Sequence, residues 1–249
     1  PSYGPQSQTA RILGLDTITV RRLPTEKEWI IDREAWDEVL SQVDLLTICP
    51  QLNPVGWTYT DEDRKWLIEA CKRHDVRIIS DEVYSGADRN WKPFFEEGDN
   101  CVSISSLTKV HGLGQIRYGW MIASQEIIAN AENTFHNMAG IMSSPVIRVA
   151  DRIKDRLHEP VDLIEYYREM NLPILEQCLS RLGIEWNSPP YGVFGAFRIP
   201  GIDTMEMIDT IGKEFGLLAV PGCMFDSGLD DWLRVGWSID PESFAKAVE

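Results

Sequence analysis

Three short apolar segments, each followed within two residues by a polar residue, constrain the fold of this chain more than any other feature. They span residues 44–49, 76–80 and 101–105, and each has the length of a buried strand. Between the first two, Thr60 and the acids after it predict a helix start, and apolar residues at helical spacing extend this helix to about His74. Strand, helix and strand in this order predict a mainly parallel sheet covered by helices, which is an α/β fold.

The remaining patterns divide the chain into two predicted domains. A fourth strand is expected at 118–122, and residues 145–182 are expected to be helical, with interruptions at Pro160 and Pro173. Short strands are expected around 195–199, 217–220 and 233–237, with helices over 204–215 and from 241 onward. We therefore predict a large α/β domain over residues 1–145 and a smaller α+β domain over residues 146–249.

Composition excludes several classes of protein. Lys and Arg total 24 and Asp and Glu total 39, so the formal net charge is −15, which disfavours binding to nucleic acids and anionic membranes. The apolar runs are much shorter than the ~20 residues of a membrane-spanning helix. Five scattered cysteines, with no Cys-x-x-Cys pair and no histidine cluster, predict neither a metal site nor a disulfide framework. Because no signal segment is visible, we expect a cytoplasmic protein.

The polar residues that follow the three strands carry the candidate chemistry. Asn53 follows the first strand within Asn-Pro-Val-Gly, Asp81 follows the second within Asp-Glu-Val-Tyr, and Lys109 follows the third within Ser-Leu-Thr-Lys. Arg117 comes eight residues after Lys109. Because ligands bind beyond the carboxyl ends of parallel strands, we expect an amide, a carboxylate, an amine and a guanidinium to share one site.

These motifs, in this order and on successive strand ends, resemble those of the pyridoxal-phosphate-dependent aminotransferases of class I/II, which have fold type I. The resemblance covers nearly the whole chain, from the segment of Tyr3 to that of Arg234. It implies pyridoxal 5'-phosphate as cofactor, transamination between an amino acid and a 2-oxoacid, and a homodimer. It also implies that the chain lacks the N-terminal portion of the large domain, which family members carry before the segment of Tyr3.

The resemblance assigns a role to each residue of the predicted site. Lys109 is the catalytic residue, because its amine forms an imine with the cofactor and later moves the substrate proton. Asp81 pairs with the ring nitrogen of the cofactor and keeps that nitrogen protonated. Asn53 and Tyr84 hydrogen-bond the phenolic oxygen of the ring, and Asn53 also contacts the substrate.

The other residues implied by the resemblance hold the ring faces, the phosphate and the substrate. Val83 packs on one face of the cofactor ring and Tyr3 stacks on the other. Ser106 and Arg117 bind the phosphate, for which a guanidinium is well suited. Arg234 binds the substrate α-carboxylate.

Several alternatives stay open at the level of sequence. Asn53 is also a plausible turn former, Tyr84 a core residue, and Arg234 an arginine on an edge strand. β-Elimination and racemisation use the same lysine, aspartate and arginine as transamination. A non-catalytic domain that keeps the fold for ligand sensing or interaction is a further alternative. Val55 stands where the family usually has threonine, which is a mild departure.

Overall fold

The computed structural model describes residues 3–25, 28–216 and 218–248, and its internal contacts divide the chain into two units. Unit 1 comprises residues 1–33, 51–60 and 164–249, and unit 2 comprises residues 34–50 and 61–163. These units are defined by contacts and neither ends between residues 145 and 146. The predicted domain boundary at that position stays a prediction. None of the helices in the described ranges combines the length and the apolar character that a membrane crossing needs.

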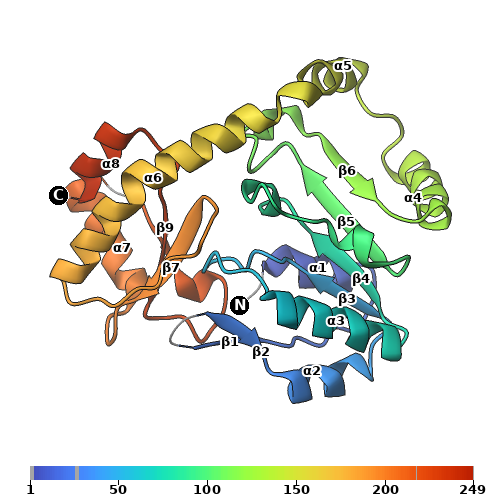
Figure 1. The fold of residues 1–249 in the computed structure, drawn as a ribbon, viewed down its shortest axis with the longest axis horizontal. Coiled ribbons are helices and arrows are strands. Elements are labelled where there is room, and N and C mark those ends of the chain that lie inside the picture. The colour runs from blue at the N-terminus through green and yellow to red at the C-terminus, as the bar shows by residue number, and fades with distance from the viewer. Residues whose placement is uncertain (1–2, 26–27, 217, 249) are drawn as a thin grey trace. The chain divides into compact units, whose positions relative to one another are not determined.

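Unit 2 is built on a four-stranded sheet (Figure 1). Its strands, in spatial as well as sequence order, are β3 (Leu45–Ile48), β4 (Arg77–Asp81), β5 (Cys101–Ser106) and β6 (Gly119–Ile122). The first three run parallel and β6 runs antiparallel to β5. The four strands expected from the sequence are therefore confirmed, together with the mainly parallel character of the sheet.

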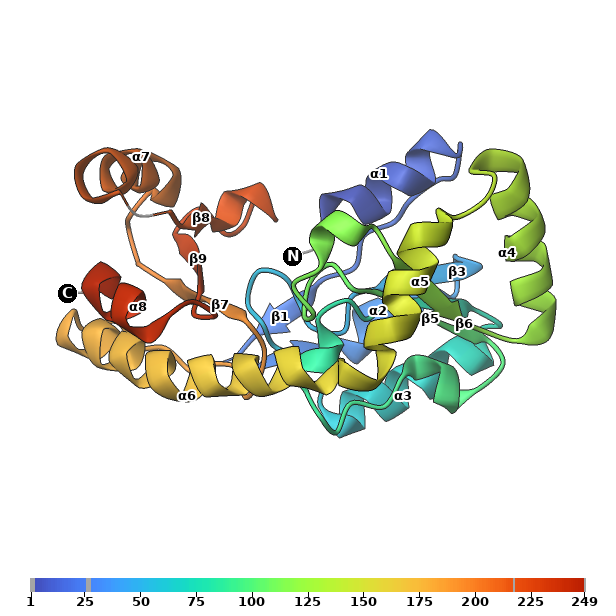
Figure 2. The same ribbon diagram turned by 90° about the horizontal axis from the view of Figure 1, so that it is seen from above.

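Helix α3 (Asp61–Arg73) covers one face of this sheet (Figure 2). It begins with three acidic residues, whose charge favours the N-terminal end of a helix. Its buried side includes Leu67 and Cys71, and the facing strand β4 buries Ile78. Unit 2 also contains most of α2 (Arg33–Leu40), together with α4 (Gln125–Met138) and α5 (Ser144–Ile153).

Unit 1 contains a three-stranded antiparallel sheet of β7 (Phe194–Arg198), β9 (Trp232–Gly236) and β8 (Val220–Pro221), with β9 in the centre. A separate hairpin pairs β1 (Arg22–Pro24) with β2 (Trp29–Ile31). The helices are α1 (Gly4–Ile12), α7 (Thr204–Phe215), α8 (Pro241–Val248) and most of α6 (His158–Arg181). The larger core cluster of unit 1 joins Leu172, Leu175, Leu179, Phe197, Leu233, Trp237 and Phe244.

Two expectations from the sequence are corrected by the structure. The predicted helical region is interrupted at residues 154–157, between α5 and α6, and Pro160 lies in the first turn of α6, but Pro173 lies inside α6 and does not interrupt it. Leu172 and Leu175, on either side of Pro173, are buried in the core of unit 1, and this packing offsets the ~3 kcal/mol that a proline costs inside a helix. The strand expected at 217–220 begins only at Val220, and Leu217 lies outside the described residues.

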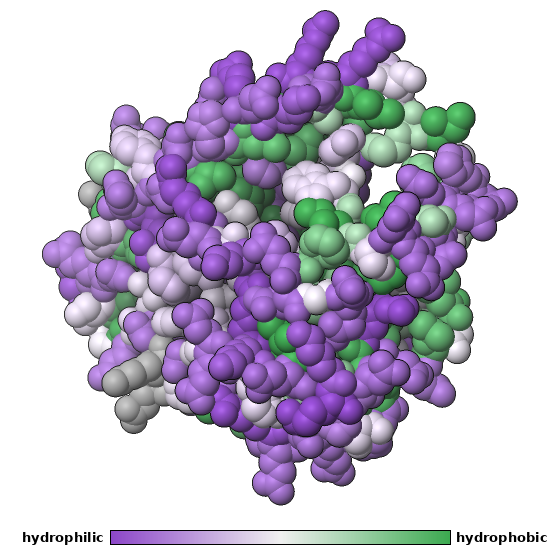
Figure 3. Space-filling model, turned by 45° about the vertical axis from the view of Figure 1, so that its right-hand side comes forward, coloured by the Kyte–Doolittle hydropathy of each residue, from purple (hydrophilic) through white to green (hydrophobic). Residues whose placement is uncertain are grey.

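Other elements were not expected from the sequence. They are the β1–β2 hairpin and the helices α1, α2 and α4. On the surface, hydrophilic side chains dominate the face shown in Figure 3, in agreement with the net charge of −15.

Candidate active site

The carboxyl ends of β4 and β5 bring the predicted residues of unit 2 to one edge of its sheet. Asp81 is the last residue of β4, and Ser106 is the last residue of β5. The two strands are parallel neighbours, with Asp81 in register with Ile104. Because parallel strands end at the same edge, the segments that carry Asp81 and Lys109 leave the sheet on the same side.

The turn after β4 fixes the position of Asp81. The backbone N–H of Val83 donates a hydrogen bond to Oδ1 of Asp81 at 3.3 Å. Tyr84 follows as the residue that precedes a short 3₁₀ helix, Ser85–Ala87. Asp81, Val83 and Tyr84 are all partly exposed, so their side chains remain accessible to a ligand.

Glu82 anchors this turn from the opposite side of the strand, and sequence reasoning missed it. Its side chain is buried, and Oε1 accepts hydrogen bonds from the N–H of Phe94 at 2.9 Å and from Oγ of Ser103 at 2.7 Å. Oε2 accepts a third from Nε1 of Trp91 at 3.1 Å. Successive side chains of a strand point to opposite faces, so the buried Glu82 directs its neighbour Asp81 away from this network. The signal available in the sequence was the adjacent pair of acids at a strand end.

The loop that carries Lys109 is closed on itself by backbone hydrogen bonds. The N–H of Leu107 donates to the carbonyl of Tyr118 at 3.0 Å, and the N–H of Leu113 donates to the carbonyl of Leu107 at 2.9 Å. At its start, Oγ of Ser106 accepts a hydrogen bond from the N–H of Thr108 at 3.2 Å. The loop therefore holds Lys109 on a fixed backbone.

Lys109 lies next to Tyr84 although the two residues follow different strands. Nζ of Lys109 is 5.7 Å from the centroid of the Tyr84 ring, and the lysine side chain is exposed. Arg117, at the other end of the loop, is also exposed and has a left-handed backbone conformation with φ 55°. Its Nη1 atom donates to the carbonyl of Gly114 at 3.4 Å.

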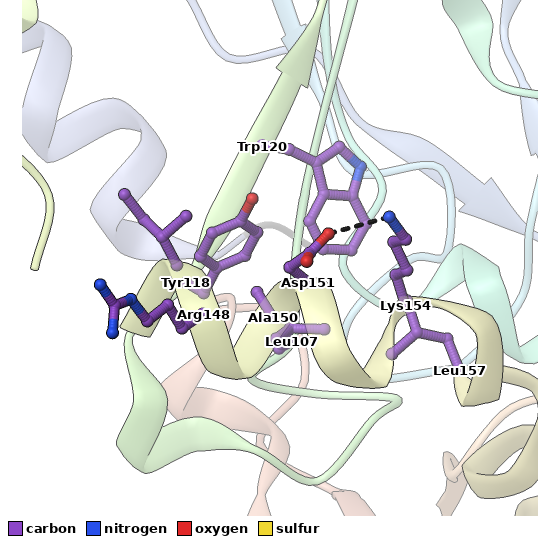
Figure 4. A pocket seen from close by; sticks show the side chains of 9 residues that line it. Leu107, Tyr118, Trp120, Arg148, Ala150, Asp151, Lys154 and Leu157 are labelled. Atoms are coloured by element: carbon purple, nitrogen blue, oxygen red, sulfur yellow. Dashed lines mark hydrogen bonds and ion pairs between the residues drawn. The ribbon is translucent and has the colours of Figure 1, made fainter. Parts of the chain in front are cut away.

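A separate cavity of about 410 Å³ lies beside this loop in unit 2 (Figure 4). Leu107, Tyr118 and Trp120 line it together with residues of α5, and Nζ of Lys154 pairs with Oδ1 of Asp151 at 2.8 Å. None of the predicted site residues is among those that line this cavity. Leu107 and Tyr118, at the two ends of the Lys109 loop, thus contribute to the cavity, but Lys109 itself does not line it.

Unit 1 carries the remaining predicted residues, of which Asn53 is the most buried. Its exposed fraction is 6%, and its Oδ1 atom has no hydrogen-bond partner among the described residues. The Asn53–Pro54 peptide bond is cis. Gly56 completes the motif with φ 80°, and a Cβ atom there would lie 2.4 Å from the carbonyl oxygen of Phe194, so only glycine fits.

Arg234 lies on the central strand of the unit 1 sheet, not on an edge. It is in register with Ala196 of β7 on one side and with Val220 of β8 on the other. Its guanidinium lies over the ring of Phe194, 4.2 Å from the centroid, and 5.7 Å from that of Phe225. Aromatic rings on a partly buried guanidinium orient it without neutralising its charge.

Tyr3 precedes helix α1 and is 47% exposed. No described contact orients its ring toward the other predicted residues, so its stacking role stays a prediction.

The residue set fits the cofactor that the sequence resemblance implies. Unit 2 offers an accessible amine, a carboxylate, a hydroxyl and a guanidinium at one sheet edge, which match the aldehyde, the ring nitrogen and the phosphate of pyridoxal phosphate. Within unit 1, the buried Asn53 side chain has an oxygen with no protein partner among the described residues. A buried polar atom without a partner is costly unless a ligand or water satisfies it.

Comparison with protein families gives one match over the whole chain. The family model described as aminotransferase class I and II matches residues 1–249. A probable aminotransferase of Arabidopsis thaliana, TAT1, is 33% identical, with 100% of this chain and 60% of that protein covered. The histidinol-phosphate aminotransferase of Blochmanniella pennsylvanica is 28% identical over 61% of this chain and 41% of its own length. The chain thus spans about two fifths to three fifths of the length of these relatives.

Solved structures share the fold at low sequence identity. An N-succinyldiaminopimelate aminotransferase of Mycobacterium tuberculosis superposes with a TM-score of 0.85 at 18% identity, covering 100% of this chain and 68% of its own. An aspartate aminotransferase of Thermus thermophilus gives 0.84 at 19% identity, covering 100% and 66%. A C-S lyase of Staphylococcus hominis, solved with pyridoxal phosphate bound, gives 0.86 at 17% identity, again covering 100% and 66%.

Proposed function

This chain belongs to the class I and II aminotransferase family and has the α/β architecture of fold type I, and from this premise we propose that it binds pyridoxal phosphate and transfers amino groups between an amino acid and a 2-oxoacid. One observation supports the proposal most strongly. Parallel neighbouring strands carry Asp81 and the Lys109 loop to the same sheet edge, where the lysine Nζ lies 5.7 Å from the Tyr84 ring centroid.

We propose the following residues as the cofactor site. Lys109 is the attachment point, since its side chain is an exposed primary amine on a closed loop. Asp81 faces the ring nitrogen, while Tyr84 and Asn53 contact the phenolic oxygen. The remaining positions of the proposed cofactor site are Val83 and Tyr3 at the ring faces and Ser106 and Arg117 at the phosphate.

When bound, pyridoxal phosphate supplies an electron sink that stabilises negative charge at the substrate α-carbon. Asp81 sustains that capacity by holding a proton on the ring nitrogen through its negative charge. The amine of Lys109 would remove the proton from the substrate α-carbon as general base and deliver it again as general acid. Arg234 binds the substrate carboxylate through two parallel hydrogen bonds and so fixes the α-carbon.

Covalent labelling tests the proposal. The chain is incubated with pyridoxal phosphate, reduced with borohydride and digested, and the modified lysine is located by mass spectrometry. We expect the modification at Lys109, its loss in Lys109→Ala, and its persistence in Lys92→Ala, which changes an exposed lysine of the same unit. A modification that survives in Lys109→Ala, in protein with an unchanged circular dichroism spectrum, would refute the assignment.

The reaction itself needs a second assay, because a solved C-S lyase has the same fold. Amino acids are supplied as donors with a panel of 2-oxoacids as acceptors, and products are separated by chromatography. Formation of a new amino acid matched by a new 2-oxoacid supports transamination. Ammonia and a thiol from a cysteine-like substrate would instead establish β-elimination.

A further inference from the structure

Unit 1 contains a hollow of about 860 Å³ that the proposed function does not use. Four of the nine tryptophans of the chain line it, namely Trp29, Trp57, Trp186 and Trp232. They come from the β1–β2 hairpin, the segment after Asn53, the segment before β7, and β9. Four stretches of sequence thus contribute tryptophan side chains to the wall of this hollow.

The aromatic walls are held in place before any ligand arrives. Trp29 is only 5% exposed and meets Trp232 edge to face, with ring centroids 5.6 Å apart. Nε1 of Trp186 donates a hydrogen bond to the carbonyl of Ala196 at 2.9 Å. Trp57 packs against the same core cluster as Trp232. Rings that are already ordered lose little conformational entropy on binding a ligand.

Two carboxylates give the hollow a negative charge. Glu28 and Glu185 line it, and the side chain of neither forms a hydrogen bond or ion pair with any of the described residues. Arg198 also lines it, but its Nε atom is paired with Oδ2 of Asp231 at 2.7 Å, which offsets its charge. Among the described residues that line the hollow, the charge is therefore net negative, which favours cations over anions.

We propose that this hollow binds a small organic cation whose charged nitrogen carries methyl groups, of the quaternary ammonium class. The faces of tryptophan rings attract cations more strongly than other side chains do, and a methylated ammonium loses less hydration than a bare one when it enters an aromatic site. The glutamates add long-range attraction, and the methyl groups fill apolar space. The site lies wholly within unit 1 and its occupation does not depend on the cofactor.

Calorimetric titration with choline tests this proposal, and 3,3-dimethylbutan-1-ol serves as the neutral probe of matching shape, with carbon in place of the charged nitrogen. We expect saturable binding of choline and no comparable binding of the alcohol. Trp57→Leu should weaken choline binding by about two- to fivefold, as loss of one cation–π contact does. Glu28→Gln and Glu185→Gln should each weaken it as well, whereas Glu206→Gln, an exposed acid of α7 in the same unit, should not.

Three results would overturn the proposal. They are the absence of saturable choline binding, equal affinity for choline and the alcohol, and unchanged affinity in Glu28→Gln and Glu185→Gln. Both glutamates are at least partly exposed, so these variants are expected to fold, and thermal melting verifies that they do. Loss of binding in Glu206→Gln to the same extent would also contradict the assignment, because it would indicate a general charge effect.

Discussion

Asp81 illustrates how a single residue acquires its role from its position. It ends β4, is partly exposed, and is held by the N–H of Val83, while the adjacent Glu82 is buried in a network of its own. Two neighbouring carboxylates thus have separate tasks, because alternate residues of a strand face opposite sides. The buried one stabilises the sheet edge, and the accessible one is available to a ligand.

We predict that Asp81→Asn retains cofactor binding but loses most turnover. Asparagine keeps the shape but removes the charge, and a neighbouring opposite charge shifts a pKa by ~1–3 units, enough to change the protonation of a ring nitrogen near neutral pH. The turnover number and the absorption spectrum of the bound cofactor are measured together. Asp99→Asn, which changes an exposed acid, is the control. If Asp81→Asn changes neither the turnover number nor the absorption spectrum, Asp81 is not part of the proposed site.

His111 gives a prediction about pH. Burial lowers the pKa of its imidazole below the ordinary value, although a hydrogen bond to the backbone of Leu157 acts in the opposite direction. The unfolded chain therefore takes up this proton at a higher pH than the folded chain does. The free energy of unfolding therefore does not depend on this imidazole above its unfolded-state pKa of ~6.5, and it decreases as the pH falls below that value.

When the pH is lowered from 7 to 5, we expect the free energy of unfolding to decrease less for His111→Asn than for the original chain. Urea unfolding at several pH values measures the difference, with His136→Asn, an exposed histidine on α4, as control. A parallel pH dependence for the original chain and His111→Asn would show that burial of this imidazole does not contribute.

At the scale of elements, Glu82 joins parts of unit 2 that are distant in sequence. Its carboxylate holds the end of β4 to Ser103 of β5 and to the N–H of Phe94 at the start of a 3₁₀ helix. Trp91 donates to its second oxygen. The edge that presents Asp81 and Lys109 therefore depends on a buried acceptor carried by the residue that follows Asp81.

Glu82→Gln is predicted to lower the free energy of unfolding by about 1–3 kcal/mol, because one acceptor oxygen becomes an amide donor and its partner is left without a bond. Urea unfolding is the measurement, and Glu96→Gln is the control, since Glu96 is exposed on the 3₁₀ helix that Glu82 anchors. Equal destabilisation of the two variants would mean that the buried network adds nothing beyond surface charge.

The elements that were predicted correctly are those with a signal in their own residues, such as an apolar run or a helix-capping side chain. The unit 2 strands carry short apolar runs, and α7 spans the predicted residues 204–215, with Asp203 accepting hydrogen bonds from the first turn. Pro173 was misjudged because burial of its neighbours outweighs the local cost, and the β1–β2 hairpin was missed because its strands have only three residues each. The site of Asn53, Asp81 and Lys109 was inferred from their spacing and stays a prediction, whereas Glu82 and the tryptophan hollow depend on contacts between segments far apart in sequence.

At the scale of the whole molecule, the chain spans 66–68% of the solved chains with which it was superposed. Exposed apolar side chains accompany this partial span, among them Met138, Ile141 and Ile147 of unit 2. Contact of these residues with another polypeptide would bury apolar area, which stabilises by about 25 cal/mol for each Å². The described part of the chain therefore has apolar surface available for further polypeptide.

We predict that the 249-residue chain binds pyridoxal phosphate more weakly than a full-length class I/II aminotransferase measured beside it. Ser106 and Arg117 are the phosphate ligands proposed here, and the relatives with which the chain was compared are longer than it, so the part of them that this chain does not match can supply further donors. Absorbance titration gives both affinities. Equal affinities would show that the chain needs no further phosphate ligands.

The division of unit 1 into three separated stretches has a consequence for synthesis on the ribosome. Residues 1–33 and 51–60 emerge early, yet the β7–β9 sheet and the helices that complete their unit come from residues 164–249. At about 5–20 residues per second, translation from residue 60 to residue 249 takes roughly 10–40 s. During that interval the second stretch of unit 2, residues 61–163, is synthesised before the residues of unit 1 that contact Trp29 and the Asn53 segment. Residues 1–33 and 51–60 can therefore pack into the complete unit 1 only after residues 164–249 have been synthesised.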